Sequence, residues 1–310
     1  MHGFLSSLLL IFFSASLFAS GSLTHISNIS RAPMQDNNAL NFVGVGQFVS
    51  ITNPVSVGAR GNLLYIVDAA KQLVYRYNSS NEKLTPLYSV SSHLQGVPNA
   101  IAVDHDGSFF LSDPFGRQVL HFTMQGDLRQ IYKDAINLTN PVSVNLAPSG
   151  ELYIADRLYD HVVVFNRGGQ PLRAIGQRGT GKGQFLEIID MATGPDGIYV
   201  IDRLSKNVKV FSSDGVLIRE MPRLEVVAPT AIAIDYAERV YISDDFDDTI
   251  KIYNRNGLLE TVGGTGSRDG MFRMISDLHA DNNFLYVADS ANNRVQVFML
   301  KAAFDNEKEE

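Results

Sequence analysis

The chain has 310 residues, 45% of them hydrophobic, which is enough for a large core in one or two domains. Lys and Arg number 26 against 33 Asp and Glu, and the formal charge of -7 argues against a mainly electrostatic grip on nucleic acid or anionic lipid. The sequence has no cysteine, which excludes disulfides, thiolate nucleophiles and cysteine-ligated zinc.

The N-terminal residues 1–21 resemble a secretory signal peptide. An apolar run from Phe4 to Ala19 carries no charged side chain, and small residues suited to cleavage follow it. The run is shorter than the ~20 residues of a membrane span. Because no Lys or Arg precedes it, an uncleaved anchor or a buried segment stays open as an alternative. We expect export to the periplasm or the extracellular space, with no transmembrane segment in the mature chain.

The remainder of the chain repeats one template six times. In each copy an Asp ends an apolar run, Val or Ile follows six positions later, and an aromatic residue follows nine positions later. The six aspartates are Asp68, Asp113, Asp156, Asp202, Asp244 and Asp289. Such internal periodicity indicates a repeat architecture in which each copy is one structural unit.

Each unit reads as four short strands. In the second unit NAIAV, SFFLSD, VLHF and LRQIY alternate apolar and polar residues and are separated by turn residues. Four antiparallel strands that recur every ~40–45 residues are typical of a β-propeller blade. We therefore predict an all-β, six-bladed propeller of four-stranded antiparallel blades.

The two ends of the chain predict how the ring closes. The sixth unit stops after its third strand, and the segment Asn41–Phe48 matches the fourth-strand segments of other units. We expect this N-terminal strand to complete the last blade, which would remove two exposed sheet edges. The predicted organisation is a signal peptide at 1–21, a polar linker at 22–39, the propeller at 40–303 and an acidic tail at 304–310.

A glycine-rich stretch from Gly176 to Lys182 resembles a phosphate-binding loop. The residue after the lysine is Gly183, where that loop needs a hydroxyl for magnesium, and a β-branched segment rather than a helix follows. The stretch aligns with other segments that leave a fourth strand. We interpret its glycines as tight crossings between blades.

The repeated units resemble NHL repeats. The matching segments are VPNAIAVD (97–104), APTAIAID (228–235), YIAD (153–156) and YVADSANNRVQVF (286–298), and the resemblance covers about residues 40 to 300. It implies the propeller fold, but it leaves function open because function depends on sites added to a fold. Relatives of NHL propellers include binding modules, exported proteins, lyases and hydrolases.

The first strands of the blades line the axis, and polar residues break their small-residue pattern. Asp190 and Asp277 stand where the family pattern is small, His279 lies two residues beyond Asp277, and Asn99 begins the first strand of the second unit. Oxygen ligands from three directions suit calcium, so Asn99, Asp190 and Asp277 are candidate ligands for calcium or for a polar molecule. The alternative is a channel lined by polar groups that water bridges.

Six copies of one Asp cannot form one active site, so we expect each repeated aspartate to cap its own loop through backbone N–H groups. The residues after them vary. Arg157 and Arg203 follow two of them on adjacent blades and could bind a carboxylate or phosphate, or pair with surface acids such as Asp160.

No convincing catalytic set emerges from the sequence. Amidating-lyase relatives carry zinc on histidines near the start of the first strands, and no histidine stands there in this chain. We expect a monomeric exported scaffold that binds a protein, peptide or glycan on its loop-rich face, with no nucleic acid partner and no cofactor. The alternative is a calcium-dependent hydrolase or lactonase that resembles gluconolactonase and paraoxonase, with its site on the axis.

Overall fold

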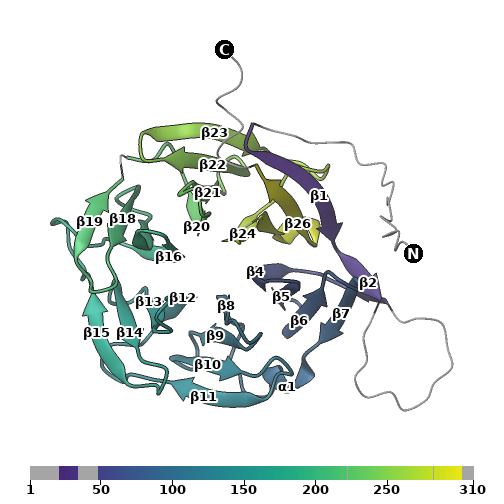
Figure 1. The fold of residues 1–310 in the computed structure, drawn as a ribbon, viewed down its shortest axis with the longest axis horizontal. Helices are drawn as coiled ribbons and strands as arrows, with labels where there is room; N and C mark the ends of the chain where they lie inside the picture. Colours follow the sequence, from purple (N-terminus) through teal and green to yellow (C-terminus); the bar gives the residue numbers. More distant parts are fainter. Residues whose placement is uncertain (1–20, 34–47, 222, 282, 302–310) are drawn as a thin grey trace, which may run out of the picture.

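The structure is a computed structural model that describes residues 21–33, 48–221, 223–281 and 283–301. Within these ranges six four-stranded antiparallel sheets stand as blades around one axis (Figure 1). The predicted all-β, six-bladed propeller is therefore confirmed. No helix among the described residues has the length and apolar character that crossing a membrane requires.

Blades 1 to 5 run in chain order from the axis outwards. Blade 1 consists of β4 (Pro54–Arg60), β5 (Leu63–Asp68), β6 (Leu73–Asn78) and β7 (Lys83–Pro86), followed by the short helix α1 (Tyr88–Ser91). Blade 2 consists of β8 (Ile101–Val103), β9 (Phe109–Asp113), β10 (Gln118–Phe122) and β11 (Leu128–Tyr132). Blade 3 consists of β12 (Pro141–Leu146), β13 (Leu152–Asp156), β14 (His161–Phe165) and β15 (Pro171–Ile175). Blade 4 consists of β16 (Ile188–Gly194), β17 (Gly197–Asp202), β18 (Asn207–Phe211) and β19 (Leu217–Glu220). Blade 5 consists of β20 (Pro229–Ile234), β21 (Val240–Asp244), β22 (Thr249–Asn254) and β23 (Gly257–Gly263).

Blade 6 joins the two ends of the described chain. Its inner strands are β24 (Ile275–Ala280), β25 (Phe284–Asp289) and β26 (Arg294–Leu300), with a 3-10 turn, Ser290–Asn292, between the last two. Its outermost strand is β1 (Leu23–Ile29), which pairs antiparallel with β26 from Leu23 opposite Leu300 to Ile29 opposite Val295 (Figure 1). An N-terminal strand closes the last blade, as predicted.

The identity of that closing strand was predicted wrongly. The segment Asn41–Phe48 lies outside the described residues except for Phe48, which begins β3 (Phe48–Ser50) and pairs with β2 (Arg31–Pro33). The segment 22–39, expected to be a polar linker, contains both β1 and β2. A β2–β3 hairpin therefore separates the closing strand from the crossing into blade 1, and the closing strand lies further upstream than the repeat pattern suggested.

The closing strand is held by burial as well as by its ladder. Leu23 is completely buried and packs in one cluster with Phe272 and Phe298, whereas Ile26 on the opposite face of β1 is 42% exposed. Fully burying a side chain of this size contributes roughly 1.5–3 kcal/mol. This alternation is what anchors a short strand at the outer edge of the ring.

The hydrophobic core is divided among the gaps between blades. Buried apolar residues of the described chain form six clusters, and each cluster joins two neighbouring blades. The cluster between blades 6 and 1, for example, brings Val295 and Val297 of β26 against Ile66 of β5. Because each blade packs on both of its neighbours, the ring depends on its last closure for a continuous core.

Glycines permit the tight crossings out of the fourth strands. Gly176 and Gly263 have φ of 73° and 94°, a region that favours glycine. The aromatic residue that ends each crossing lies against its glycine, and a side chain on Gly176 would come within 2.3 Å of the Phe185 ring. This packing explains the glycine-rich stretch between Gly176 and Lys182 without any bound phosphate.

Candidate functional site

The six repeated aspartates are structural caps, as predicted. Asp202 is completely buried and accepts the backbone N–H groups of Leu186 and Glu187 at 2.9 and 3.1 Å, which ties the crossing into blade 4 to the end of β17. Equivalent bonds are made by Asp68, Asp113, Asp156, Asp244 and Asp289. Charge-assisted bonds of this kind are strong, so these carboxylates fix the backbone and are not free for chemistry.

The loop that follows each aspartate repeats one backbone feature. The residue four positions after it has a left-handed φ between 51° and 57° in all six units, and these residues are Gln72, Arg117, Asp160, Lys206, Asp248 and Asn293. None of them is a glycine. The loops between second and third strands therefore share a left-handed residue at one position, and the loop of blade 6 differs in forming a short 3-10 turn over Ser290–Asn292.

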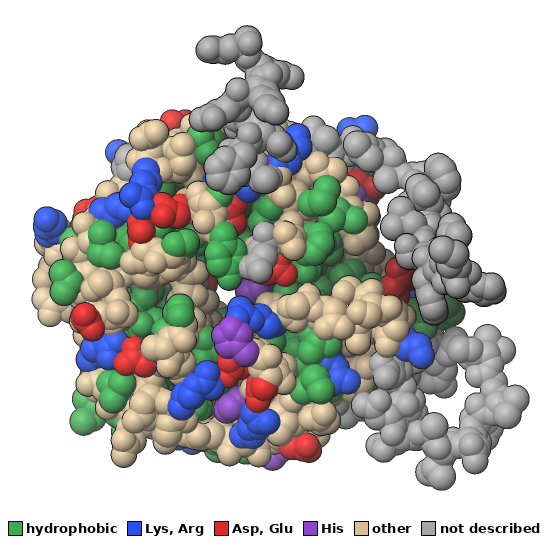
Figure 2. All heavy atoms as spheres, viewed as in Figure 1, with side chains coloured by type: hydrophobic (Ala, Val, Ile, Leu, Met, Phe, Trp, Pro, Cys, Tyr) green, Lys and Arg blue, Asp and Glu red, His purple; other side chains and the backbone are tan. Residues whose placement is uncertain are grey.

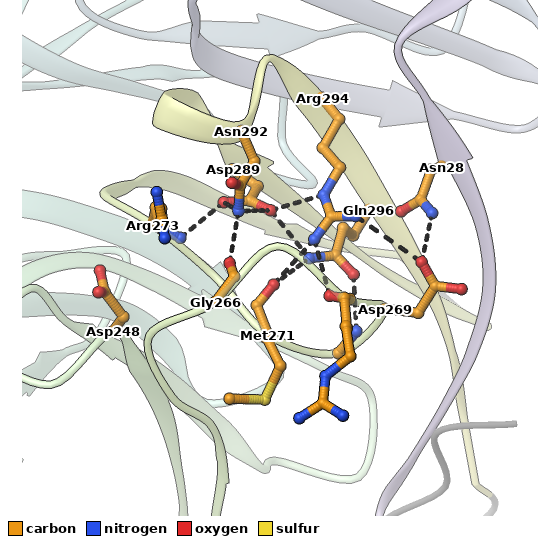
Figure 3. A network of polar contacts seen from close by, with 12 residues as sticks. Asn28, Asp248, Gly266, Asp269, Met271, Arg273, Asp289, Asn292, Arg294 and Gln296 are labelled. Atoms are coloured by element: carbon orange, nitrogen blue, oxygen red, sulfur yellow. Dashed lines mark hydrogen bonds and ion pairs between the residues drawn. The ribbon is translucent and has the colours of Figure 1, made fainter. Parts of the chain in front are cut away.

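In the sixth unit the capping aspartate organises a larger polar network (Figure 3). Asp289 accepts bonds from Arg294 Nε at 2.7 Å and from Gln296 Nε2 at 3.0 Å, and both side chains also donate to the carbonyl of Met271. Asn28 of the closing strand reaches the same region and donates to Asp269 at 2.7 Å. The network fastens the crossing into blade 6 and the N-terminal strand to β26, and we assign it a structural role.

Near the axis, polar side chains of the first strands latch neighbouring blades together. The Oδ2 atom of Asp277 in blade 6 accepts the Ser56 hydroxyl at 2.6 Å and the Val57 N–H at 2.8 Å, both in blade 1. Ser56 in turn accepts the N–H of Ile101 in blade 2 at 3.1 Å. The inner strand of each blade has an unpaired edge, so these side chains satisfy N–H groups that no further strand can reach.

A second latch of the same kind joins blades 4 and 5. Asp190 accepts the N–H of Ile232 in blade 5 at 2.9 Å and the N–H of Met191 in its own strand at 2.8 Å. A bulge in the pairing of β16 with β17 falls between Ile188 and Asp190, and β24 has the matching bulge before Asp277. The bulge turns both carboxylates towards the next blade.

Asp190 and Asp277, whose hydrogen bonds join neighbouring blades, form part of the wall of a cavity on the axis. The cavity has a volume of about 480 Å³ and is lined by the first strands of all six blades. Its rim is made by the turns between first and second strands, so it opens on the face opposite the loops that follow the repeated aspartates. Residues at this rim include Arg60, His105, Pro148, Pro195, Tyr236 and Asp281.

Figure 2 views the ring along its axis. Lys and Arg, Asp and Glu, and His side chains gather close together near the centre of the visible face. Two of the rim acids have basic partners, because Asp104 accepts Arg167 at 2.7 Å and Asp235 accepts Arg239 at 2.6 Å. Their charges are therefore largely balanced by these arginines.

Burial shifts the pKa values of three titratable groups inside the cavity towards the neutral form of each side chain. Burial raises the pKa of Asp190, and burial together with repulsion from Asp190 raises the pKa of Asp277 further. Burial lowers the pKa of His279. The Nε2 atom of His279 donates to the carbonyl of Ala59 at 3.0 Å, which leaves Nδ1 as an acceptor in the neutral ring.

The residues proposed as calcium ligands are not brought together. Asn99 is exposed, is not part of the cavity lining, and donates to the carbonyl of Val142 at 3.4 Å. Asp190 and Asp277 both face the axis, but both oxygens of each carboxylate accept N–H or hydroxyl donors. Across the described ranges no three His, Asp or Glu side chains are grouped to hold a metal. Asn99 therefore does not share the cavity with the two carboxylates.

Arg157 and Arg203 pair with a surface acid, as the second of the two expectations stated, but that acid is Glu187 and not Asp160. Both guanidinium groups pair with the carboxylate of Glu187, and Asp160 instead accepts Arg178 Nε at 2.7 Å. The physical reason is the crossing into blade 4, which places Glu187 between the loops of blades 3 and 4. Two cations on one anion leave a local excess of positive charge around Glu187.

The loop-rich face carries a feature that the sequence interpretation did not identify. The residue two positions after the repeated aspartate is large, apolar and exposed in four consecutive blades: Phe115 (76%), Leu158 (48%), Leu204 (63%) and Phe246 (71%). We call these four residues the apolar arc. The signal was visible in the repeats, because the equivalent residues in units 1 and 6 are the small Ala70 and Ala291.

The loop backbone holds the arc in place. The capping carboxylate accepts an N–H from within the loop, as Asp156 does from Leu158 at 2.9 Å and Asp244 does from Phe246 at 3.3 Å. Apolar side chains on a fixed turn lose little further backbone freedom when a partner binds. The arc is therefore preorganised for contact.

Comparison with known proteins agrees with this architecture. Residues 133–255 match a family model described as a 6-bladed beta-propeller, and residues 272–298 match the NHL repeat model. None of the curated proteins matches the sequence.

Solved structures share the fold at low identity. A virginiamycin B lyase from Staphylococcus aureus, solved with quinupristin in a catalytically inactive form, has a TM-score of 0.59 at 11% identity and covers 81% of this chain and 96% of its own. A gluconolactonase from Xanthomonas campestris has a TM-score of 0.61 at 14% identity, over 81% of this chain and 87% of its own. A Bacteroides thetaiotaomicron protein of unknown function reaches 0.64 at 15% identity, over 90% and 76%. At such identities the likeness establishes the fold alone.

Proposed function

Because the chain is a six-bladed β-propeller that carries an NHL repeat, we propose that it is an exported binding module that takes up a protein or peptide on the apolar arc. The observation that carries the proposal is the exposure of Phe115, Leu158, Leu204 and Phe246 at one loop position in four successive blades. Single exposed apolar residues are common on monomeric proteins, whereas several of them at equivalent positions on one face support an interaction site.

The character of the arc favours a protein or peptide over a glycan. Two phenylalanines and two leucines offer few hydrogen-bonding groups, and the exposed Tyr159 beside Leu158 adds a further ring. Aromatic side chains and arginines are enriched among residues that contribute most to protein interfaces. The net positive group formed by Arg157, Arg203 and Glu187 lies on the same face and favours a partner with an acidic residue.

Export is proposed from the sequence. The apolar run between Phe4 and Ala19 and the small residues after it motivate the assignment, and these residues lie outside the described ranges. Mass analysis of the mature protein recovered outside the cytoplasm tests it. A mature N-terminus near Ala19 or Gly21 supports export with cleavage, and full-length protein retained in the cytoplasm contradicts it.

The binding proposal is tested by quantitative capture of a partner from the exported fraction. Leu204→Ser and Phe246→Ser should each reduce capture of the partner retained by the wild-type chain. Val216→Ser is the matched control, because Val216 is 65% exposed in a turn between β18 and β19, on the opposite face. Equal losses in all three variants, or loss on Asp190→Asn with retention in the arc variants, contradict the proposal.

The alternative of a calcium-dependent hydrolase has weaker support. The axial position of Asp190 and Asp277 and the raised pKa of both carboxyls are compatible with acid–base chemistry. The bonds that both carboxylates make to backbone N–H groups account for their placement without catalysis. Melting temperatures with calcium and with EDTA distinguish a catalytic role of these carboxyls from a structural one.

A further inference from the structure

The cavity on the axis is separate from the apolar arc and opens on the other face. Its volume of about 480 Å³ lies within the ~300–1,000 Å³ range of small-molecule pockets. Four blades have a residue with little or no side chain at the fourth position of the first strand: Gly58, Ala102, Ala192 and Ala233. The three alanines line the cavity and leave room for it.

The two exceptions at that position supply hydrogen-bond acceptors. Asn145 uses its Nδ2 to donate to the Met191 carbonyl at 2.8 Å, and no described residue occupies its Oδ1. His279 uses its Nε2 on Ala59, and no described residue occupies its Nδ1. Both side chains line the cavity. A ligand that fits this wall must bring N–H or O–H donors.

Charge narrows the class of ligand. The carboxyls of Asp190 and Asp277 in the cavity wall disfavour an anion. The rim acids Asp104 and Asp235 are already paired with Arg167 and Arg239, which leaves them little charge to hold a cation. Burial raises the pKa of both carboxyls, which reduces the negative charge of the wall. Neutral hydroxyl groups can donate to Asn145 and His279 without bringing a charge into this cavity.

Apolar side chains lie between the polar groups of the cavity wall. Met191, Leu146 and the prolines Pro148 and Pro195 line the cavity between the polar groups, and Tyr236 stands at the rim with 69% of its surface exposed. Such surfaces suit the C–H faces of a ring that carries hydroxyls on its edge. A mixed lining of this kind, with a few convergent polar groups, is typical of small-molecule sites.

We propose that this axial cavity binds a small neutral polyhydroxylated molecule of the size of a monosaccharide, whose hydroxyl groups donate to Asn145 Oδ1 and His279 Nδ1. The ligand enters from the face formed by the turns between first and second strands. Its binding is independent of the partner on the apolar arc, since the two sites lie on opposite faces.

The test is isothermal titration of the purified full chain with D-glucose, D-galactose, D-xylose and myo-inositol, and with putrescine and gluconate as cationic and anionic probes. We expect saturable binding of at least one neutral probe. Asn145→Ala should weaken it about tenfold, as expected for the loss of one hydrogen bond at a partly desolvated site. Ala192→Leu, which adds side-chain volume to the wall, should abolish it.

Leu204→Ser is the control, because it changes the apolar arc and should leave sugar binding unchanged. Thermal unfolding of each variant shows that the fold is retained. If Ala192→Leu does not fold, Asn145→Ala and His279→Gln carry the test, since each changes an acceptor without adding bulk. The proposal is overturned if no neutral probe binds, if putrescine or gluconate binds in place of the neutral probes, or if affinity is unchanged in the cavity variants.

Discussion

The hydroxyl of Ser56 donates a 2.6 Å hydrogen bond to Oδ2 of Asp277, although 221 residues separate them in the chain. The bond joins the innermost strand of the first blade to that of the last one. It lies near the axis, whereas β1 pairs with β26 at the outer edge of the last blade. Hydrogen bonds therefore close the ring at both its inner and its outer circumference.

Removing the acceptor of this bond should destabilise the ring. Asp277→Ala leaves the Ser56 hydroxyl and the N–H groups of Val57 and Leu278 without their partner, and we expect a loss of about 2–4 kcal/mol in the free energy of unfolding. Urea denaturation measures it. Asp214→Ala, which removes an exposed turn carboxylate, should change stability by less than about 0.5 kcal/mol. Similar values for the two variants would show that the latch contributes nothing.

The two axial carboxyls should make stability fall with rising pH. A raised pKa means that the folded chain holds a proton which the unfolded chain releases, so stability falls as the pH rises from the ordinary Asp value of 3.8 to the folded-state pKa values of about 6 for Asp190 and about 8 for Asp277. Asp190→Asn removes one such group and the repulsion that raises the pKa of Asp277. We expect the free energy of unfolding of this variant to fall less steeply above pH 4 than that of the wild type. Identical slopes would argue against the coupling.

Only the buried face of the closing strand β1 should contribute to the free energy of unfolding. Leu23→Ala removes a completely buried side chain that packs with Phe272 and Phe298, and we expect a loss of about 2–5 kcal/mol. Ile26→Ala changes the exposed face of the same strand and should have little effect. Thermal or urea unfolding compares them. A large effect at Ile26, or none at Leu23, would contradict the assignment of β1 as the closing strand.

Calcium should not stabilise the protein. The oxygens of Asp190 and Asp277 are engaged by backbone or hydroxyl donors, and Asn99 lies apart from both. We therefore expect the melting temperature to be the same with calcium and with EDTA. A calcium-dependent rise that disappears in Asp190→Asn and Asp277→Asn would instead support the hydrolase alternative.

The repeats made most of the fold predictable. The spacing of Asp, β-branched and aromatic residues identified six units because each unit must build the same sheet and the same cap. The closing strand was assigned wrongly because Asn41–Phe48 carries the glycine pattern of a crossing, whereas Leu23–Ile29 carries only a partial alternation of buried residues. A hairpin inserted before the first blade leaves no periodic signal.

The candidate sites were less predictable because they depend on contacts between units. Asp190, Asp277 and His279 do share the cavity, but Asn99 does not line it. The pairing of Arg157 and Arg203 with Glu187 depends on how the crossing into blade 4 lies between two loops, which no single repeat encodes. The apolar arc, in contrast, could have been found by aligning the residues after each aspartate.

The six loops each have a buried aspartate at their start and a left-handed residue four positions later. In four of them an exposed apolar side chain stands between these two points. Single substitutions at these exposed loop positions can therefore change which partner the face binds, while the capping hydrogen bonds of the scaffold stay the same. Partner preference and folding stability can then change independently of each other during evolution.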